Sequence, residues 1–158
     1  QTLLQQIDTE LRRIIYALRP PILDAMGLVP AIKELASRSQ QYSQIKCSMK
    51  VFGEPFRFPE DVEIGIYRLI QEALHNVTSH AEASQVNLSM KFNEEGLNLI
   101  INDNGIGFDL DHFLAQPTEH LGLIGMRERA QHIGGQIEIQ TKPHQGTKLI
   151  LKVPSKSA

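Results

Sequence analysis

The stretch PEDVEIGIYRLIQEALHNVTSH, residues 59–80, decides the fold of this chain. Its apolar residues recur three and four positions apart, which is the periodicity of a helix with one buried face. Pro59 suits the start of a helix, because the first turn leaves its backbone N–H groups without partners in any case. The acidic residues that follow, Glu60 and Asp61, favour the positive end of the helix dipole. We therefore expect a long helix from Pro59 to about Ser79 that packs against another layer.

Alternating apolar and polar residues predict strands on both sides of this helix. The expected strands cover residues 45–51, 86–92, 97–102, 136–140 and 147–153. Further helices are expected over residues 28–36 and 122–133, with a turn or cap at 24–27 and a loop at 103–120 that has room for one short helical turn. This order predicts the α+β class: a two-layer α/β sandwich whose mixed, largely antiparallel sheet is covered on one face by about three helices.

A separate amphipathic helix is expected before the first pair of prolines. Its apolar residues recur at coiled-coil spacing, at Leu4, Ile7, Leu11, Ile14 and Leu18. Pro20 and Pro21 end this helix, because neither has a backbone N–H to donate. A single apolar stripe needs a partner, which is either a second helix, such as another copy of this one, or the chain's own domain. The chain starts in the middle of this pattern without an initiator methionine, which indicates a fragment of a longer protein.

The composition excludes several classes of function. The 158 residues fit one domain, and 41% of them are hydrophobic. A net charge of −2 and the absence of tryptophan argue against a nucleic-acid-binding protein. Cys47 is the only cysteine, which rules out an internal disulfide and a cysteine-rich zinc site and favours the reducing cytoplasm. No apolar run is long enough to cross a bilayer, so a membrane anchor would belong to segments outside this chain.

Polar residues four positions apart line one face of the long helix: Arg68, Glu72, Asn76 and His80. Such a row can serve a magnesium-phosphate centre. Asn76 would offer an oxygen to Mg²⁺, which prefers few protein ligands and keeps phosphate oxygens and waters. Glu72 could polarise an attacking group, and His80 could contact a phosphate. A solvated helix face explains the same pattern, and for this stretch alone that interpretation is favoured.

A second stretch, LIINDNGIGF at residues 99–108, is an apolar strand that runs into a glycine-bearing loop. Glycines let the backbone approach a flat ligand and adopt positive φ. Asp103 at the strand end could accept a hydrogen bond from the exocyclic amine of adenine, whereas it would repel the carbonyl oxygen of guanine. The pattern would therefore select ATP over GTP. An ordinary Asn-Gly turn is the alternative for this stretch taken alone.

Two shorter stretches complete the set. LGLIGMRERA, residues 121–130, places glycines at the mouth of a helix, where unpaired N–H groups favour an anion such as a triphosphate. An ordinary glycine-led helix start explains it equally well. In QGTKL, residues 145–149, Thr147 is either an ordinary strand threonine or a hydroxyl that reaches the adenine edge. Other phosphate motifs are absent, since the chain contains no G-x-x-x-x-G-K-[ST] sequence.

In this order, the four stretches resemble the N, G1, G2 and G3 boxes of the ATPase superfamily that unites gyrase, the large heat-shock chaperone, histidine kinases and MutL. The resemblance extends from about Leu11 to Val153. The junction LRPPILDAMGL, residues 18–28, is similar to the L-R-P-x-x-L-x-x-x-G-L junction of one branch of sensor histidine kinases. Members of that branch typically phosphorylate response regulators that have a LuxR-type output domain.

The resemblance implies a Bergerat-type ATPase fold and two segments. Residues 1–20 would be the last helix of an incomplete dimerisation and phosphoacceptor bundle, and residues 21–158 would be the ATP-binding catalytic domain. The chain would then donate the γ-phosphoryl group of ATP, with Mg²⁺ as cofactor, to a histidine upstream of this fragment. From there the group would pass to an aspartate of the regulator. The full-length protein would be a homodimer.

The resemblance also implies roles for individual residues. Asn76 would bind Mg²⁺, Asp103 would bind the adenine amine, and Glu72 would orient or activate the phosphate acceptor. Residues 109–120 would form a lid over the nucleotide. The remaining ATP-binding residues would be His80, Gly105, Gly107, Gly122, Leu123 and Thr147.

The chain departs from the branch in three places. The phosphoacceptor motif H-D/E-x-x-x-Q is missing, so this fragment is expected to bind ATP but not to phosphorylate itself. His75 stands where threonine is commoner, and Glu119 stands where a glycine is frequent. Two alternatives keep the same fold: a regulatory nucleotide-binding module without catalysis, and a protein-serine kinase of the anti-sigma-factor type.

Overall fold

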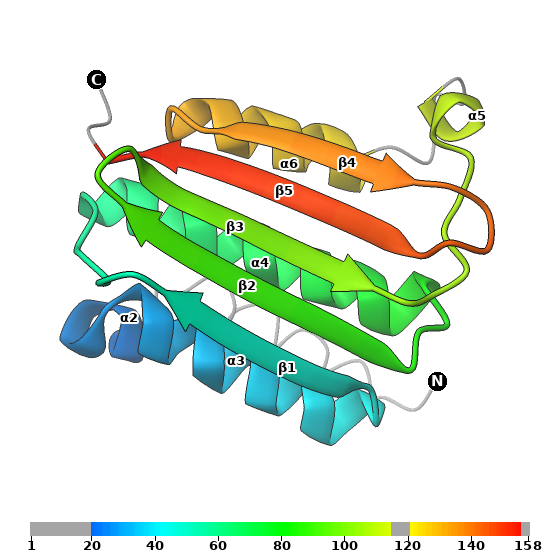
Figure 1. Ribbon diagram of the computed structural model, residues 1–158, viewed down its shortest axis with the longest axis horizontal. Helices are drawn as coiled ribbons and strands as arrows, with labels where there is room; N and C mark the ends of the chain where they lie inside the picture. The colour runs from blue at the N-terminus through cyan, green and yellow to red at the C-terminus, as the bar shows by residue number, and fades with distance from the viewer. Residues whose placement is uncertain (1–19, 115–120, 156–158) are drawn as a thin grey trace, which may run out of the picture.

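The computed structural model describes residues 20–114 and 121–155, which form two layers (Figure 1). The helices are α2 Pro21–Met26, α3 Leu28–Ser43, α4 Glu60–His80, α5 Leu110–Leu114 and α6 Leu121–His132. The strands are β1 Lys46–Phe52, β2 Gln85–Asn93, β3 Gly96–Asp103, β4 Gln136–Thr141 and β5 Thr147–Pro154. The five strands make one sheet, and α3, α4 and α6 lie behind it in Figure 1. The predicted α+β two-layer sandwich is confirmed.

The strand order in the sheet is β1-β2-β3-β5-β4. Strand β1 pairs with β2 in parallel, and the other three pairs are antiparallel. A parallel pair needs a long crossover connection, and α4 supplies it between β1 and β2. The helix that carries the row of polar residues is therefore fixed against the centre of the sheet. The mixed, mostly antiparallel sheet agrees with the prediction.

Residues 24–27 agree with the prediction of a turn or cap only in part. Gly27 is the cap, but residues 24–26 belong to the short helix α2, which runs from Pro21 to Met26. Pro21 begins this helix, because its fixed φ suits the first helical position. Gly27 breaks the helix with φ +85° and donates its N–H to the carbonyl of Leu23. The coiled-coil helix predicted before residue 20 and the lid residues 115–120 lie outside the described residues.

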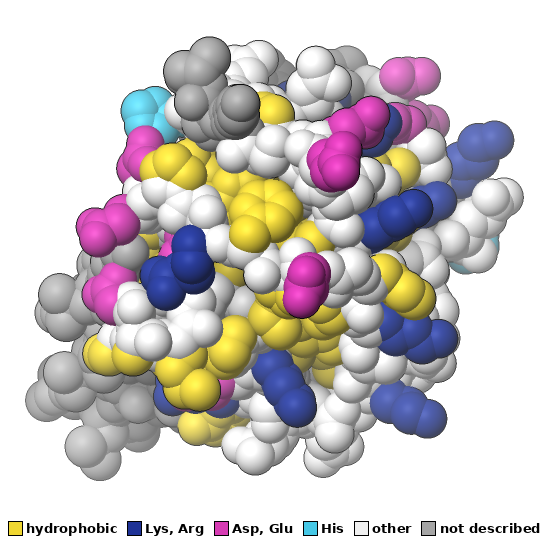
Figure 2. Space-filling view, turned by 60° about the vertical axis from the view of Figure 1, so that its left-hand side comes forward, with side chains coloured by type: hydrophobic (Ala, Val, Ile, Leu, Met, Phe, Trp, Pro, Cys, Tyr) yellow, Lys and Arg dark blue, Asp and Glu magenta, His cyan; other side chains and the backbone are white. Residues whose placement is uncertain are grey.

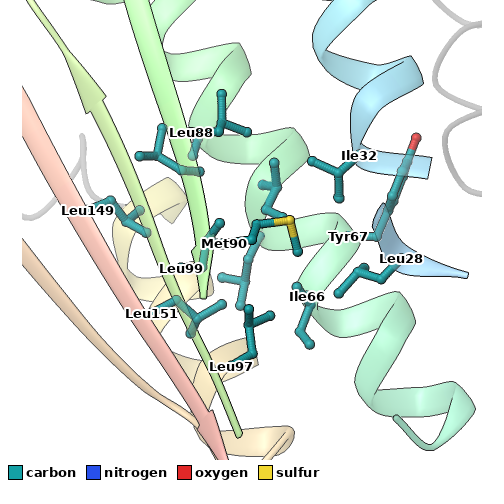
Figure 3. Packing of buried hydrophobic residues seen from close by; sticks show 14 of the residues in the cluster. Leu28, Ile32, Ile66, Tyr67, Leu88, Met90, Leu97, Leu99, Leu149 and Leu151 are labelled. Atoms are coloured by element: carbon teal, nitrogen blue, oxygen red, sulfur yellow. The ribbon is translucent and has the colours of Figure 1, made fainter. Parts of the chain in front are cut away.

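The core lies between the sheet and its three helices. The inward residues of the strands alternate with outward ones, and they meet the apolar face of α4. In Figure 3, Met90 and Leu151 extend from the sheet toward Ile66 on α4, and all three side chains are completely buried. Such interdigitation of apolar side chains is the main source of stability in a domain of this size.

The outward face of the sheet is mostly polar, and lysines supply most of its charged side chains. Strand alternation and register place five lysines on it: Lys46, Lys50, Lys91, Lys148 and Lys152. Figure 2 shows Lys and Arg side chains on its right-hand side, where the rotation brings this face of the sheet into view. No described helix is long and apolar enough to span a membrane.

An ion pair between the buried Glu63 and the half-exposed Arg57 connects the start of α4 with α2. Glu63 is completely buried, and its two carboxylate oxygens accept hydrogen bonds from Nε and Nη2 of Arg57 at 2.8 and 3.0 Å. The Arg57 guanidinium also donates to the carbonyl of Leu23 at 3.3 Å, and the N–H of Phe58 donates to Glu63 at 3.2 Å. The hydrogen bond and the charge of Glu63 raise the pKa of Arg57 above its ordinary value. A buried carboxylate needs such partners to remain charged.

Helices α4 and α6 approach closely at Gly65. A Cβ atom placed on Gly65 would lie 2.4 Å from Cγ2 of Ile133. This distance is below any real carbon–carbon contact, so the two helices can pack at this distance only because residue 65 lacks a side chain. The contact fixes the end of α6, which Ile133 follows, against the first half of α4.

We predict that Gly65→Ala destabilises the protein by about 1–2 kcal/mol. Overpacking a core typically costs about 1–3 kcal/mol, and the higher helix propensity of alanine offsets part of that cost. Gly125→Ala is the matched control, because Gly125 also lies within a helix but no atom lies within 4 Å of its added Cβ. Urea unfolding of both variants measures the difference. Equal changes in unfolding free energy would contradict the close packing at Gly65.

Candidate functional site

A cavity of about 670 Å³ lies between the second half of α4, the loop after β3, the start of α6 and the strands β3 to β5. Eight of the predicted site residues line it: Glu72, Asn76, His80, Asp103, Gly107, Gly122, Leu123 and Thr147. Stretches that are far apart in the sequence thus meet in one place. Of the predicted residues, Gly105 alone is not part of the cavity wall.

The polar row on α4 forms one side of the cavity. Glu72 and Asn76 are half-buried, whereas His80 at the end of the helix is exposed. The Asn76 amide nitrogen lies 3.9 Å from the sulfur of Met126, which leaves the amide oxygen as the atom available to a cation. Arg68, the fourth member of the row, donates to Gln71 at 2.7 Å and does not line the cavity.

Asp103 lies at the opposite side of the cavity and is 5% exposed. Its Oδ1 atom accepts hydrogen bonds from the backbone N–H of Gly105 at 2.8 Å and of Thr147 at 3.3 Å. Burial raises the pKa of the Asp103 carboxyl, and these backbone N–H groups oppose that rise. Both donors engage the same oxygen, so the second carboxylate oxygen is the one that a ligand could use.

Gly105 supports the site from behind. A Cβ atom on Gly105 would lie 2.1 Å from the carbonyl oxygen of Ala81, and the N–H of Ile106 donates to that oxygen at 2.8 Å. Only a residue without a side chain lets the loop lie so close to the end of α4. The expectation that Gly105 shapes the pocket agrees with this packing, although it does not face the cavity.

The same loop is bound on its other side by the β4–β5 turn. Gly107 has φ +55°, and a Cβ on it would lie 2.1 Å from the carbonyl oxygen of Lys142. The N–H of His144 donates to the carbonyl of Ile106 at 2.5 Å. The loop is therefore enclosed between α4 and the turn, so its backbone is ordered before any ligand binds.

At the start of α6, Gly122 lies next to Glu72. A Cβ on Gly122 would approach Oε1 of Glu72 to 3.2 Å. The first backbone N–H groups of a helix have no partner within the helix, and they carry its positive dipole end. The cavity thus has the carboxylate of Glu72 and the amide of Asn76 on its α4 side. Next to them lies the start of α6, whose backbone N–H groups favour anions.

Sequence reasoning missed three kinds of residue in this site. The apolar wall consists of Ala73, Val77, Ala81, Ile101, Ile106, Phe108, Met126, Ile139 and Leu149. Strand alternation could have placed Ile101 and Leu149 on the inward face. His75 also lines the cavity, with Nδ1 3.4 Å from Oγ of Ser79. Thr141 does not line the cavity, but it binds the hydroxyl of Thr147, and no local pattern indicates it.

A mostly apolar cavity with a buried carboxylate at one end and a helix start at the other suits a nucleotide. The model of the family described as Histidine kinase-, DNA gyrase B-, and HSP90-like ATPase matches residues 61–157. The chain belongs to this family. Membership of this ATPase family implies that the chain binds ATP, and the resemblance to sensor histidine kinases is confirmed.

Two curated relatives are histidine kinases or sensors by name. The chain is 41% identical over 145 residues to the signal transduction histidine-protein kinase/phosphatase DegS of Brevibacillus brevis, covering 92% of this chain and 37% of DegS. It is 35% identical over 156 residues to the sensor protein VraS of Staphylococcus saprophyticus, covering 98% of this chain and 43% of VraS. The chain thus spans about two fifths of the length of these relatives.

A solved structure has the same fold. The ATP-binding domain of PrrB from Mycobacterium tuberculosis matches with a TM-score of 0.61 at 22% identity, covering 81% of this chain and 93% of that one. At this identity the likeness shows the fold alone. The five-stranded sheet and its helices are accordingly those of a histidine kinase ATPase domain.

The raised pKa of Asp103 predicts a specific pH dependence for the variant Asp103→Asn. The folded protein binds a proton at Asp103 more readily than the unfolded chain, so this contribution to stability is full at low pH and is lost as the pH rises through the raised pKa. Asparagine does not titrate, so the variant lacks this pH-dependent contribution. The stability of the wild type relative to Asp103→Asn should therefore increase as the pH falls from 7 toward the ordinary aspartate value of 3.8.

Urea unfolding of both proteins across this pH range measures that difference without ligand. The prediction is contradicted if the difference in unfolding free energy between the wild type and Asp103→Asn stays constant, or decreases, as the pH falls. Either result would mean that Asp103 is not an ionised, desolvated carboxyl in the free protein.

Proposed function

We propose that this chain is the ATP-binding catalytic part of a two-component sensor histidine kinase. The whole protein would transfer the γ-phosphoryl group of ATP to a histidine outside residues 1–158, and then to an aspartate of a response regulator with a LuxR-type output domain. The family match supports ATP binding, and the names of the relatives support kinase chemistry. Homodimerisation, cytoplasmic location and the boundary at residue 20 belong to the same proposal.

The observation that carries this proposal is the buried carboxylate of Asp103. Its Oδ1 is engaged by two backbone N–H groups, so the second oxygen can accept a hydrogen bond from the exocyclic amine of adenine. The nearby apolar wall would cover the faces of the base. Gly107 keeps the loop backbone against the β4–β5 turn, so this end of the cavity needs little rearrangement.

The other end of the cavity suits the phosphates. Gly122 and Leu123 lie at the start of α6, where backbone N–H groups would bind phosphate oxygens. His80, exposed at the end of α4, would contact a phosphate when it donates a hydrogen bond. Asn76 would bind Mg²⁺ through its amide oxygen.

The residues present fit a magnesium ion that is shared with the nucleotide. Among the described residues, no group of three or more His, Cys, Asp or Glu side chains could hold a metal. Mg²⁺ commonly uses one or two protein oxygens and completes its shell with phosphate oxygens and waters. The ion would neutralise charge on the phosphates, while Asn76 fixes where they lie. Glu72, one turn before Asn76, would orient the incoming histidine or accept its proton.

We predict that Asp103→Asn lowers the affinity for ATP by at least about tenfold. If the asparagine oxygen keeps both backbone N–H bonds, its NH₂ group takes the place of the free carboxylate oxygen and opposes the adenine amine. Losing a hydrogen bond to a charged group typically costs about 1.5–3 kcal/mol, which is tenfold or more in affinity. Calorimetric titration with ATP and Mg²⁺ measures the affinity, and Lys33→Gln on the exposed face of α3 is the control. Unchanged ATP affinity in Asp103→Asn would remove the adenine assignment.

We also predict that Glu72→Gln abolishes phosphoryl transfer but keeps ATP binding. The chain would be mixed with labelled ATP and a separately produced phosphoacceptor hairpin from DegS. The wild type should form acid-labile phosphohistidine on the hairpin, because it supplies every group around the γ-phosphate. Glu72→Gln should lose most of this transfer and retain its affinity for ATP. Absence of labelling by a wild type that binds ATP would favour a regulatory module without catalysis.

A further inference from the structure

The strand residue Thr141 makes three hydrogen-bonding contacts with one hydroxyl group. Its Oγ1 donates to the carbonyl of Gly146 at 3.0 Å, accepts from the N–H of Phe108 at 3.1 Å, and lies 3.2 Å from Oγ1 of Thr147. Thr141 and Thr147 are cross-strand partners at the end of the β4–β5 pair. The half-buried Thr141 thus connects the loop after β3 with the first residue of β5.

The chemistry of these partners fixes the direction of each hydrogen bond. A hydroxyl has one hydrogen and two acceptor lone pairs. The carbonyl of Gly146 can only accept, so it takes the hydrogen of Thr141. The N–H of Phe108 can only donate, so it takes one lone pair. The remaining lone pair of Thr141 can bind Thr147 only if Thr147 donates.

The direction matters because Thr147 lines the cavity beside Asp103. The backbone N–H of Thr147 donates to Oδ1 of Asp103 at 3.3 Å, which places the two residues at the same end of the site. Since the hydroxyl hydrogen of Thr147 is used by Thr141, its oxygen can only accept from a ligand or from a water bound to it. Asp103 as a carboxylate can also only accept. Both side chains therefore favour a ligand that donates.

We propose that Thr141 is a positioning residue for base selection: it keeps the Thr147 hydroxyl an acceptor and thereby disfavours a carbonyl at position 6 of the purine. A free hydroxyl at residue 147 would rotate and donate to such a carbonyl, which would relax the selection made by Asp103. This inference rests on the proposed function, because it assumes that the base of ATP lies against Asp103. It adds a residue outside the cavity wall that controls which base is bound.

Thr141→Val tests the proposal, because valine keeps the β-branched shape and removes the hydroxyl. ATP is compared with inosine triphosphate, in which a carbonyl replaces the 6-amino group and N1 carries a hydrogen. Purine riboside triphosphate, which lacks a group at position 6 and keeps N1 as an acceptor, separates the effect of position 6 from that of N1. The ratio of the dissociation constant for inosine triphosphate to that for ATP should fall by about 3- to 10-fold in Thr141→Val. This change corresponds to one hydrogen bond of ordinary strength. Thr141→Ser keeps the hydroxyl and should retain the wild-type ratio. The ratio is taken within one protein, so it does not depend on the fraction that is folded.

A second pair of variants distinguishes selection from support of the fold. Thr147→Val removes the hydroxyl that Thr141 orients, so adding Thr141→Val to it should leave the ratio unchanged. Equal weakening of both nucleotides by Thr141→Val, or a ratio that shifts as much in the Thr147→Val background, would overturn the proposal and leave only a structural role. A wild type that binds neither nucleotide would instead overturn the proposed function itself.

Discussion

The hydrogen bonds from Gly105 and Thr147 to the carboxylate of Asp103 are the interaction on which the site depends. They join the end of β3, the loop that follows and the start of β5 at one buried acceptor. The carboxylate is kept out of water although this raises its pKa, so the free protein bears an electrostatic cost at neutral pH. A donor group on the ligand would offset that cost. In the proposed function, the base would therefore be bound by a carboxylate whose burial lowers the stability of the free protein at neutral pH.

Around this acceptor, the fold combines rigid elements with short polar groups. Many side chains along one face of α4 are buried, so the helix is held in place. Glu72 and Asn76 on its other face therefore keep fixed positions. The glycines of the loop permit close backbone contacts with Ala81 and Lys142. The cavity therefore owes its shape to main-chain packing, and its chemistry to a few side chains at its two ends.

The sequence predicted the parts of this arrangement that repeat or follow a local rule. The periodicity over residues 59–80 predicted α4 to within one residue at each end, and strand alternation predicted all five strands. The prediction of a turn or cap at residues 24–27 agrees with Gly27, which caps α2, but it missed the short helix that Pro21 begins. Gly105 was placed on the site, but only the structure shows that it packs behind the cavity. The roles of Thr141 and of the buried Glu63 depend on partners in other segments, and no periodicity could indicate them.

The outward lysines of the sheet have a consequence for how the strands align during folding. Side chains in a strand alternate between the two faces, so a shift of one residue in β1 or β5 would turn their lysines toward the helices and expose their leucines, methionine or valines. Burying an ammonium group without a partner is costly, whereas burying a leucine is favourable. A β4–β5 hairpin with a shifted register is therefore less stable than the native one. Only the native register of β5 puts Thr147 opposite Thr141 and next to Asp103. The lysines on the outward face of the sheet thus favour the strand alignment that positions Thr147 in the cavity on the inward face.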